Sequence, residues 1–486
     1  MNTNRLHLQI AKQNINSVIT FIDSWGREKE IPENLLTEIS GSLGATLAMI
    51  VEKSNQWNAN GEIRIDLFRK DNEFVIELLN SGIPLFPGDF EIYSARPQIE
   101  AARKRRGFSR LEFENCGRLG QKLTFGISTE VSSTPILKGS GVLERHSMDE
   151  TIIRVLRPGE EKQLSRLFHK VYGYRYISDF VYYPEKIADM IKSGRLISLV
   201  AEMSDGSLAG HVGLLQLNDS PSVFEAALGL VDPSYKTNGL FGRIFSRLQE
   251  IKKGRDFQYC IYDFVTNHEF SQRLVSKFGY RDLALFLGSQ VSETQARLST
   301  LGIGQDAIDM DRYSLLVAVE PGVPHPFGKE ISLPTQIGEA TEFLLSPLGV
   351  TWVPISRFHP LMKEGDFSLK LQPEQKAAVF DFHKPGFQAL EKIILKWREL
   401  LKDKYEYVAV DFPVNFSGLG QLYDILASHG FFMAGFVPYH YSTELAFRFQ
   451  FLTPTKVSFD NIKMHSVDGR KLLAMVRADY ERNTIL

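Results

Sequence analysis

The sequence is poor in cysteine and carries little net charge. Its 486 residues include two cysteines, Cys116 and Cys260, too few for a disulfide framework or a cysteine-based zinc site and typical of a reducing compartment. We predict no metal site. Lys and Arg number 56 and Asp and Glu number 58, so the net charge of −2 gives no overall field that favours nucleic acid or an anionic membrane.

Long hydrophobic runs are also missing. The first residues, MNTNRLHLQIAKQNIN, lack the apolar stretch of ~7 to 15 residues that a signal peptide needs. The longest apolar candidate, Leu43–Val51, has about half of the ~20 residues that a membrane-spanning helix needs. Hydrophobic residues make up 43% and charged residues 23%, as in an ordinary globular protein. We therefore expect a cytoplasmic protein that binds neither membrane nor nucleic acid.

The length predicts about three domains, at roughly 100 to 200 residues each. Residues 1–135 read as a small α+β unit, with a helix at 32–54 and two alternating strands at 62–69 and 73–80. The polar stretch 128–149 reads as a linker. From residue 151 strands and helices alternate in a mixed α/β pattern, mostly antiparallel and followed by a strand–helix–strand crossover. The expected fold is therefore mixed α/β and α+β.

An internal repeat relates the middle of the chain to its last third. Four positions are identical in the two copies, Tyr259, Asp263, Phe264 and Asn267 in one and Tyr407, Asp411, Phe412 and Asn415 in the other. A glycine that opens a helix precedes each copy, Gly239 in one and Gly386 in the other. We interpret this as a duplication covering residues 151–295 and 305–455. A tail at 456–486 follows, whose amphipathic helix 469–481 either packs on the preceding domain or binds a partner.

The segment 223–253 is the best candidate for chemistry. It runs from an apolar strand through a turn with Pro233 and Gly239 into an amphipathic helix. A glycine turn that delivers a helix N-terminus exposes unpaired backbone N–H groups at the positive end of the helix dipole. Such an end binds phosphate, although a glycine here is also compatible with a simple turn.

This segment resembles the GNAT superfamily of acyl-CoA-dependent N-acyltransferases. Their signature, Arg/Gln-x-x-Gly-x-Gly/Ala, holds the pyrophosphate of coenzyme A. Lys236 and Gly239 stand at the first two defined positions, whereas Phe241 replaces the second small residue and Gly242 follows one step later. The resemblance implies acetyl-CoA, or another acyl-CoA, as cofactor. The cofactor-binding positions it implies are Leu230, Val231, Lys236, Thr237, Asn238, Gly239, Leu240, Phe241, Gly242 and Asn267.

The resemblance also implies a catalytic base. Many GNAT enzymes have a glutamate eleven residues before the first signature position, and Glu225 stands eleven before Lys236. A carboxylate on an apolar strand has a raised pKa and can take a proton from an ammonium group, although Glu225 is also compatible with a surface strand end. A backbone N–H near Leu230 and Val231 would polarise the thioester carbonyl. The tyrosine that often serves as general acid is replaced by Val275, so the acid is not identified.

Other side chains near the candidate site have two interpretations. The aromatic stretch 172–184, with Arg175 and Asp179, either shapes an acceptor pocket or packs in the core. We expect Tyr259, Tyr262 and His268 to be structural. In the second copy His383, Pro385 and Gln388 replace the phosphate turn, so we expect this copy to close the acceptor cleft of the first. His383 and His440 are minor candidates for ligands or catalysts.

The N-terminal unit resembles the GHKL ATP-binding fold of anti-sigma-factor kinases. Helix 32–54, the strands that follow it, Asn80-Ser81-Gly82, and Gly117–Gly120 before an expected helix carry this resemblance. Asn80 replaces the adenine-reading Asp, and Met49 replaces the metal-holding Asn, so kinase activity is not expected, whereas nucleotide binding stays an alternative. A regulatory or dimerising module that contacts a regulatory protein partner is the favoured interpretation. The basic run 103–106, at the place of the nucleotide lid, reads as a solvated loop.

Two functions follow from these patterns. The first is an acyl-CoA-dependent N-acyltransferase, with acetyl-CoA as the preferred donor, that transfers an acyl group to a primary amine of a small molecule or peptide by direct attack. The alternative is a non-catalytic regulatory or scaffolding protein built from degenerate GHKL and GNAT modules.

Overall fold

The chain forms two compact units, which we describe separately. The computed structural model describes residues 3–56, 61–70, 73–86, 89, 110–128, 151–174, 176, 178–217, 222–254, 257–291, 312–322, 327, 329–355, 361–414, 416, 418–438, 445–453 and 457–484. The first unit consists of Met1–Lys192, Val200–His211 and Leu230–Leu240. The second consists of Ser193–Leu199, Val212–Gly229 and Phe241–Leu486.

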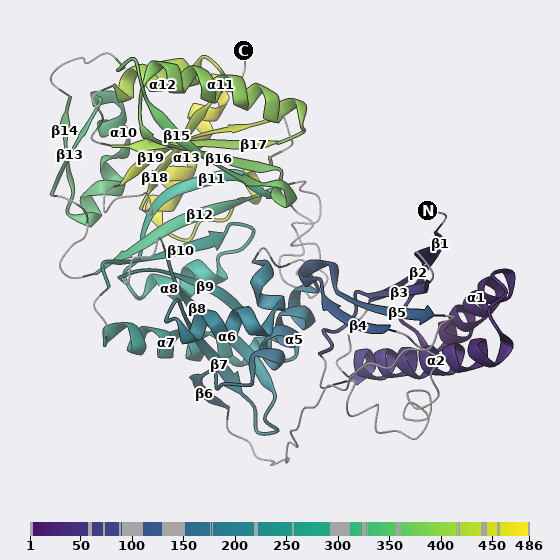
Figure 1. Ribbon diagram of the computed structural model, residues 1–486. Coiled ribbons are helices and arrows are strands. Elements are labelled where there is room, and N and C mark those ends of the chain that lie inside the picture. Colours follow the sequence, from purple (N-terminus) through teal and green to yellow (C-terminus); the bar gives the residue numbers. More distant parts are fainter. Residues whose placement is uncertain are drawn as a thin grey trace. The chain divides into compact units, whose positions relative to one another are not determined.

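A five-stranded antiparallel sheet covered by two helices forms the N-terminal part (Figure 1). The strands, in the order β1-β2-β3-β5-β4, are β1 (Asn4–Gln9), β2 (Glu62–Lys70), β3 (Glu73–Asn80), β4 (Arg110–Asn115) and β5 (Gln121–Ser128). A short 3-10 turn, η1 (Lys12–Asn14), leads into the helices α1 (Ile15–Glu28) and α2 (Glu33–Gln56). The predicted helix and both predicted strands of this part are confirmed, whereas β1 and α1 were not predicted.

Helix α2 lies in the core of this part. Its side chains Leu36, Ile39, Leu43 and Ile50 are buried and pack with alternate residues of the sheet. By length and composition, Glu33–Asn55 is apolar enough to cross a membrane, with 44% of its most apolar window buried. This helix is longer than Leu43–Val51, the longest apolar run expected from the sequence. Its apolar face packs on the sheet, as in the core helix of a globular domain.

One expectation for the N-terminal unit is wrong. A helix was expected after Gly117–Gly120, but Gly117–Leu119 form a 3-10 turn, η2, and strand β5 begins at Gln121. Gly120 has φ +93°, and a Cβ there would lie 2.2 Å from the carbonyl oxygen of Asn80. The chain therefore needs glycine for a tight reversal between two strands, and the resemblance to the GHKL fold fails at this element.

A twelve-stranded sheet dominates the rest of the chain (Figure 1). Its order is β15-β16-β17-β19-β18-β11-β12-β10-β9-β8-β7-β6. The strands are β6 (Ile152–Val155), β7 (Leu196–Glu202), β8 (Leu208–Gln216), β9 (Val223–Val231), β10 (Tyr259–Val265), β11 (Arg281–Val291), β12 (Arg312–Pro321), β15 (Asp366–Gln372), β16 (Ala377–Lys384), β17 (Tyr407–Pro413), β18 (Phe432–Val437) and β19 (Ala446–Leu452). Strands β13 (Glu330–Leu333) and β14 (Thr351–Pro354) form a separate parallel pair. The prediction of a mixed, mostly antiparallel α/β fold is confirmed.

Helices connect and cover these strands. The α-helices are α5 (Glu161–Tyr172), α6 (Pro184–Lys192), α7 (Leu240–Lys253), α8 (Phe270–Ser276), α10 (Thr335–Leu345), α11 (Phe387–Lys402), α12 (Leu419–Ala427) and α13 (Val467–Thr484). The 3-10 turns are η3 (Asp179–Tyr182), η4 (Pro233–Asn238), η6 (Ser346–Leu348), η7 (Pro373–Gln375) and η8 (Phe459–Asn461). The apolar strand, the turn and the amphipathic helix predicted within residues 223–253 are confirmed as β9, η4 and α7.

Two parts of the large sheet have the same connectivity. In β9-β10-β12-β11, the parallel strands β9 and β10 are joined by α7, and β12 then pairs antiparallel with both β10 and β11. In β16-β17-β19-β18, the parallel strands are joined by α11, and β19 pairs with both β17 and β18. Strand β12 completes the first of these two sets, although it lies within residues 305–455. The domain boundaries stay predictions. The duplication itself stays a prediction.

One row of paired residues crosses the middle of the sheet. It runs Asp411, Arg448, Gly435, Ala284, Val317, Asp263, each residue directly opposite the next on a neighbouring strand. Gly435 has φ +121°, and a Cβ there would lie 2.2 Å from the Leu283 carbonyl oxygen. The strands β11 and β18 therefore meet at a position that admits only glycine. The two repeated aspartates stand at the ends of this row.

Helix α13 packs on the last part of the sheet. Leu472 and Val476 are fully buried, and the Asp479 carboxylate accepts a hydrogen bond from the Met433 N–H at 2.8 Å. Tyr480 lies edge-on to Phe432, with ring centroids 5.0 Å apart. The tail helix, predicted at 469–481, thus packs on strand β18, which was the first of the two alternatives given for it.

Candidate active site

The parallel strands β9 and β10 separate at Glu225. They pair at three positions, with Val223, Phe224 and Glu225 opposite Tyr259, Cys260 and Ile261. Within the described strands no further pair forms, although β9 continues to Val231 and β10 to Val265. Because β10 stays paired with β12 along its whole length, the separation is between β9 and β10. Glu225 therefore stands at the last shared position of two diverging strands.

The backbone of β9 bends three residues beyond Glu225. Leu228 has φ +60°, in the left-handed region that leucine adopts only at a cost of about 1 to 2 kcal/mol. Its side chain packs over Gly213 on β8, where an added Cβ would lie 2.9 Å from the Leu228 Cδ1. A residue in this conformation inside a strand re-aims the backbone groups that follow it. Those groups include the N–H groups of Leu230 and Val231, predicted to polarise a carbonyl.

Glu225 has the electrostatics of a base. Its carboxylate is half-buried, and among the described residues it accepts no hydrogen bond. Burial among apolar neighbours is the main reason why its pKa rises to about 8, the nearby Asp263 carboxylate raises it further, and the Lys370 ammonium lowers it. A group with this pKa exchanges a proton near neutral pH, as a general base requires.

Asp263 on β10 is the second carboxylate at this place, and sequence reasoning noticed it only as part of the repeat. Its side chain is exposed to water, and it too accepts no hydrogen bond from a described residue. Its pKa is nevertheless raised, mainly by desolvation from neighbouring protein groups, while the Arg448 guanidinium opposes this rise. Since the side chain is open to water, this rise is weaker than that of Glu225. The negative charge of Asp263 disfavours the ionised form of Glu225, so the two carboxylates repel each other.

The turn predicted to bind phosphate consists of the 3-10 turn η4 and the glycine that follows it. The 3-10 turn η4 is capped by Asp232, whose carboxylate accepts the Ser234 N–H at 3.0 Å and pairs with Lys170 at 2.6 Å. Gly239 follows with φ +67°, and no described atom lies within 4 Å of the position of an added Cβ. Helix α7 begins at the next residue, Leu240. The side chains of Lys236, Thr237 and Asn238 lie outside the described residues.

The Phe241 ring does not fill this turn. It packs on β9, where two of its ring carbons lie 3.0 Å from the position of an added Cβ at Gly229. Its ring centroid is 6.3 Å from that of Phe245, one turn along α7. Gly242 contacts Leu274 on α8, since an added Cβ would lie 3.3 Å from the Leu274 Cδ1. The ring therefore belongs to the packing between α7 and β9.

The tyrosines expected to be structural have structural partners. The Tyr262 hydroxyl donates to Glu320 and accepts from Lys252 at 3.0 Å, and Lys252 pairs with Glu320 at 2.5 Å. Tyr259 is buried against Phe327, with ring centroids 5.4 Å apart. Burial lowers the pKa of His268. Val275, at the position of the family's general acid, is buried and has no titratable group.

The aromatic stretch 172–184 is packed and hydrogen-bonded. Tyr182 is fully buried and donates to the Gly173 carbonyl at 2.6 Å, and the Tyr174 hydroxyl accepts from Gln121 at 2.6 Å. Asp179 accepts the Arg118 N–H at 2.9 Å. These contacts support the core interpretation for the tyrosines. Arg175 lies outside the described residues.

The second set of strands differs from the first at the site positions. Tyr407 stands opposite Ala377, as Tyr259 stands opposite Val223, so Val379 occupies the position of Glu225. The strands β16 and β17 stay paired to Asp381 opposite Asp411, two positions further than in the first set. His383 lies 3.7 Å from Asp381 and 3.6 Å from Asp366, and is one-third exposed. His440 and Asn415 lie outside the described residues.

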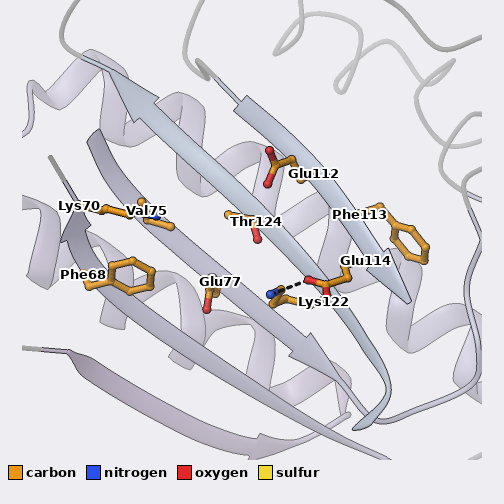
Figure 2. Close-up of a pocket in the computed structure, with 9 residues that line it drawn as sticks. All are labelled: Phe68, Lys70, Val75, Glu77, Glu112, Phe113, Glu114, Lys122 and Thr124. Carbon is orange, nitrogen blue, oxygen red and sulfur yellow. Dashed lines mark ion pairs between the residues drawn. The ribbon is translucent and has the colours of Figure 1, made fainter. Parts of the chain in front are cut away.

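The described N-terminal site positions, Asn80 and Met49, have structural surroundings. The Asn80 amide oxygen accepts the Gly82 N–H at 2.9 Å, which is a local turn, and Met49 is buried in the core. Residues 103–106 lie outside the described residues. A hollow of about 590 Å³ lies on the face of β2 to β5, and Lys122 pairs there with Glu114 at 2.6 Å. Figure 2 shows the side chains that line it. None of the predicted site residues lines this hollow. Within the described part of the chain, no group of three His, Cys, Asp or Glu side chains is arranged to hold a metal.

Comparison with known proteins finds similarity in structure alone. No family model and no curated protein matches the chain. An N-acetyltransferase from Staphylococcus aureus Mu50 is 13% identical with a TM-score of 0.29, over 36% of this chain and 99% of that chain. YncA from Salmonella typhimurium, with its cofactor acetyl-CoA, is 14% identical with a TM-score of 0.29, over 36% and 94%. NAA60 from Arabidopsis thaliana, in complex with a bisubstrate analogue, is 11% identical with a TM-score of 0.27, over 35% and 98%. At these values the similarities identify neither a family nor an activity for this chain.

Proposed function

We propose that the protein is an acyl-CoA-dependent N-acyltransferase that acts on a primary amine, with Glu225 as its base. The observation that carries this proposal is the position of Glu225 at the point where two parallel strands diverge. There the carboxylate is half-buried, has no described hydrogen-bond donor and has a pKa raised to about 8. A structural carboxylate on a strand is normally paired or fully solvated, and Glu225 is neither.

The turn before α7 fits the pyrophosphate of coenzyme A. Gly239 is in the left-handed conformation with open space around its Cα, and the backbone N–H groups that open α7 follow it. We assign cofactor binding to this turn, to the backbone at Leu230 and Val231, and to Asn267. When bound, the acyl-CoA supplies an activated acyl group. Acetyl-CoA is the proposed donor.

The chain's own residues prepare the acceptor. An aliphatic amine arrives as an ammonium ion, and Glu225 in its ionised form takes one proton from it, directly or through a water molecule. The free amine then has the lone pair needed for attack. The backbone N–H groups beyond the bend at Leu228 donate hydrogen bonds to a developing oxyanion. Val275 provides no proton for the leaving thiolate, so that proton comes from solvent or from another group.

The test combines calorimetry with the turn and base variants. The full chain is titrated with acetyl-CoA and with longer acyl-CoAs, beside Gly239→Val and Glu225→Gln. We expect Gly239→Val to weaken acyl-CoA binding at least about ten-fold, because a β-branched residue does not adopt φ +67° without strain. Glu225→Gln should bind acyl-CoA normally and lose turnover by about 100-fold or more. Failure of the wild-type chain to bind any acyl-CoA at millimolar concentration would contradict the proposal.

The remaining parts have supporting roles in this proposal. The second set of strands is a GNAT-like copy that has lost its base at Val379 and closes the acceptor side. The N-terminal part is a GHKL-derived regulatory module that contacts a regulatory protein. It is joined to the α5 region within the first unit, where Arg166 on α5 pairs with Asp89 at 2.6 Å and Gln121 bonds Tyr174. A ligand of that module would therefore act on the helices before β7. We propose a cytoplasmic location.

A non-catalytic scaffold is the second candidate. The observation that favours it is the strand pairing at Asp381 and Asp411, because these strands of the second copy do not separate where β9 and β10 do. The calorimetric experiment distinguishes the two, because a scaffold of this kind would bind no acyl-CoA.

A further inference from the structure

The two repeated aspartates have opposite surroundings. Asp411 is 3% exposed, and its two carboxylate oxygens each accept a hydrogen bond of 2.6 Å from Arg448. Asp263, at the other end of the same row, faces Val317 where Asp411 faces Arg448. Asp263 is exposed and has no described hydrogen-bond donor. The charge is neutralised in one copy and left open to solvent in the other.

Asp263 projects from the same face as Glu225. Laterally paired residues in a sheet point to one face, and so do residues two apart on a strand. Glu225 is opposite Ile261, and Asp263 follows Ile261 by two residues. The two carboxylates therefore stand on one face of two adjacent strands, at the point where those strands diverge. They are close enough for the charge of Asp263 to raise the pKa of Glu225.

The positive charges near this pair do not occupy it. Arg448 is held by Asp411 and lies over the Phe286 ring, with its guanidinium carbon 4.0 Å from the ring centroid. Lys370 on β15 is exposed, forms no described ion pair, and acts on Glu225 by stabilising its ionised form. Among the described residues Asp263 thus has neither a hydrogen-bond donor nor an ion-pair partner, while Lys370 stabilises the ionised form of Glu225.

We propose that Asp263 binds the ammonium group of the acceptor, and that the acceptor is therefore a protonated aliphatic amine with no acidic group beside it. The link between this inference and catalysis rests on the proposed function. The binding of the amine by Asp263 does not depend on it. Asp263 holds the cation next to Glu225, and Glu225 then takes the proton. A neutral acceptor of the same size gains nothing from Asp263.

Binding of four-carbon probes to the full chain tests this assignment without any thioester. The probes are butylamine, 1-butanol, butyrate and 4-aminobutyrate, measured at pH 7 by saturation-transfer NMR, which suits millimolar affinity. A hydrogen bond between charged partners contributes about 1.5 to 3 kcal/mol, so butylamine should bind at least about ten-fold more tightly than 1-butanol. Butyrate should not bind detectably. Tighter binding of 4-aminobutyrate than of butylamine would assign Lys370 to an acceptor carboxylate and overturn the proposal.

Variants identify the responsible side chain. Asp263→Asn should lower the affinity for butylamine to that for 1-butanol. Asp263→Glu should restore most of the affinity difference between butylamine and 1-butanol. The matched control is Asp424→Asn, which removes an exposed carboxylate on α12 and should leave all four affinities unchanged. Unchanged butylamine binding in Asp263→Asn would refute the inference. Acyl-CoA binding is measured separately, so a loss of the proposed function and a loss of amine recognition are distinguished.

Discussion

Replacement of Glu225 by glutamine should stabilise the protein at high pH while it abolishes turnover. The protonated carboxyl is the favoured form in the folded state, because burial and Asp263 raise its pKa from 4.5 to about 8. The stability associated with this proton is fully present below pH 4.5 and is lost as the pH rises towards 8. One pKa unit corresponds to about 1.36 kcal/mol, so the full difference corresponds to about 5 kcal/mol. Glutamine has no proton to lose, so it avoids this loss.

We expect a smaller measured gain, of about 1 to 3 kcal/mol at pH 9, because the diverging strands can relax around the charge. In a cooperative unit of this size such a gain raises the midpoint of thermal unfolding by about 2 °C or more. The assay is differential scanning calorimetry of wild type and Glu225→Gln at pH 5, 7 and 9 without ligands. At pH 5 the two midpoints should agree. A difference that is the same at pH 5 and pH 9 would refute the assignment of a raised pKa to Glu225.

Three further outcomes follow from the same geometry. Asp263→Asn should move the acidic limb of the pH–rate profile below pH 8, because it removes the like charge that raises the pKa of Glu225; an unmoved limb would exclude this coupling. Gly229→Ala should lower stability by about 1 to 3 kcal/mol, because the new Cβ would lie 3.0 Å from the Phe241 ring. The double variant Gly229→Ala/Phe241→Leu should recover most of that loss of stability in denaturant titrations. If the stability changes of the two substitutions simply add, the Phe241 ring does not press on β9. Arg448→Met should cost about 3 to 5 kcal/mol, because it leaves a buried carboxylate without its partner; a cost below about 1 kcal/mol would show that this carboxylate is solvated.

Local patterns in the sequence predicted most of the elements near the site. Alternating apolar residues, the glycine at 239 and the amphipathic run that follows it predicted β9 and α7, because these features depend on short-range geometry. The repeat around Tyr259 and Tyr407 marked two strands that occupy matching places in the sheet. Helix 32–54 and its two strands were predicted for the same reason.

Other features depend on long-range pairing that spacing does not show. Strand β12 inserts between β10 and β11, although it lies within residues 305–455. Strand β5 replaces an expected helix after Gly120, because it completes the N-terminal sheet beside β3. The role proposed for Asp263 needs the register of β9 against β10, which no local pattern contains. The repeat contained one relevant difference. Asp411 is paired with Arg448, whereas Asp263 is paired with Val317, which carries no charge.

The glycine where β11 meets β18 has a mechanical consequence. Within the described strands a single residue pair, Ala284 opposite Gly435, joins the first set of strands to the second, and residue 435 has no room for a Cβ. Side chains add bonds across this seam, because Gln450 donates to the Leu285 carbonyl and accepts the Leu287 N–H, and Arg312 pairs with Glu406 at 2.9 Å. Under a force that pulls the two sets of strands apart, the load would therefore fall on these few side chains instead of on a backbone ladder.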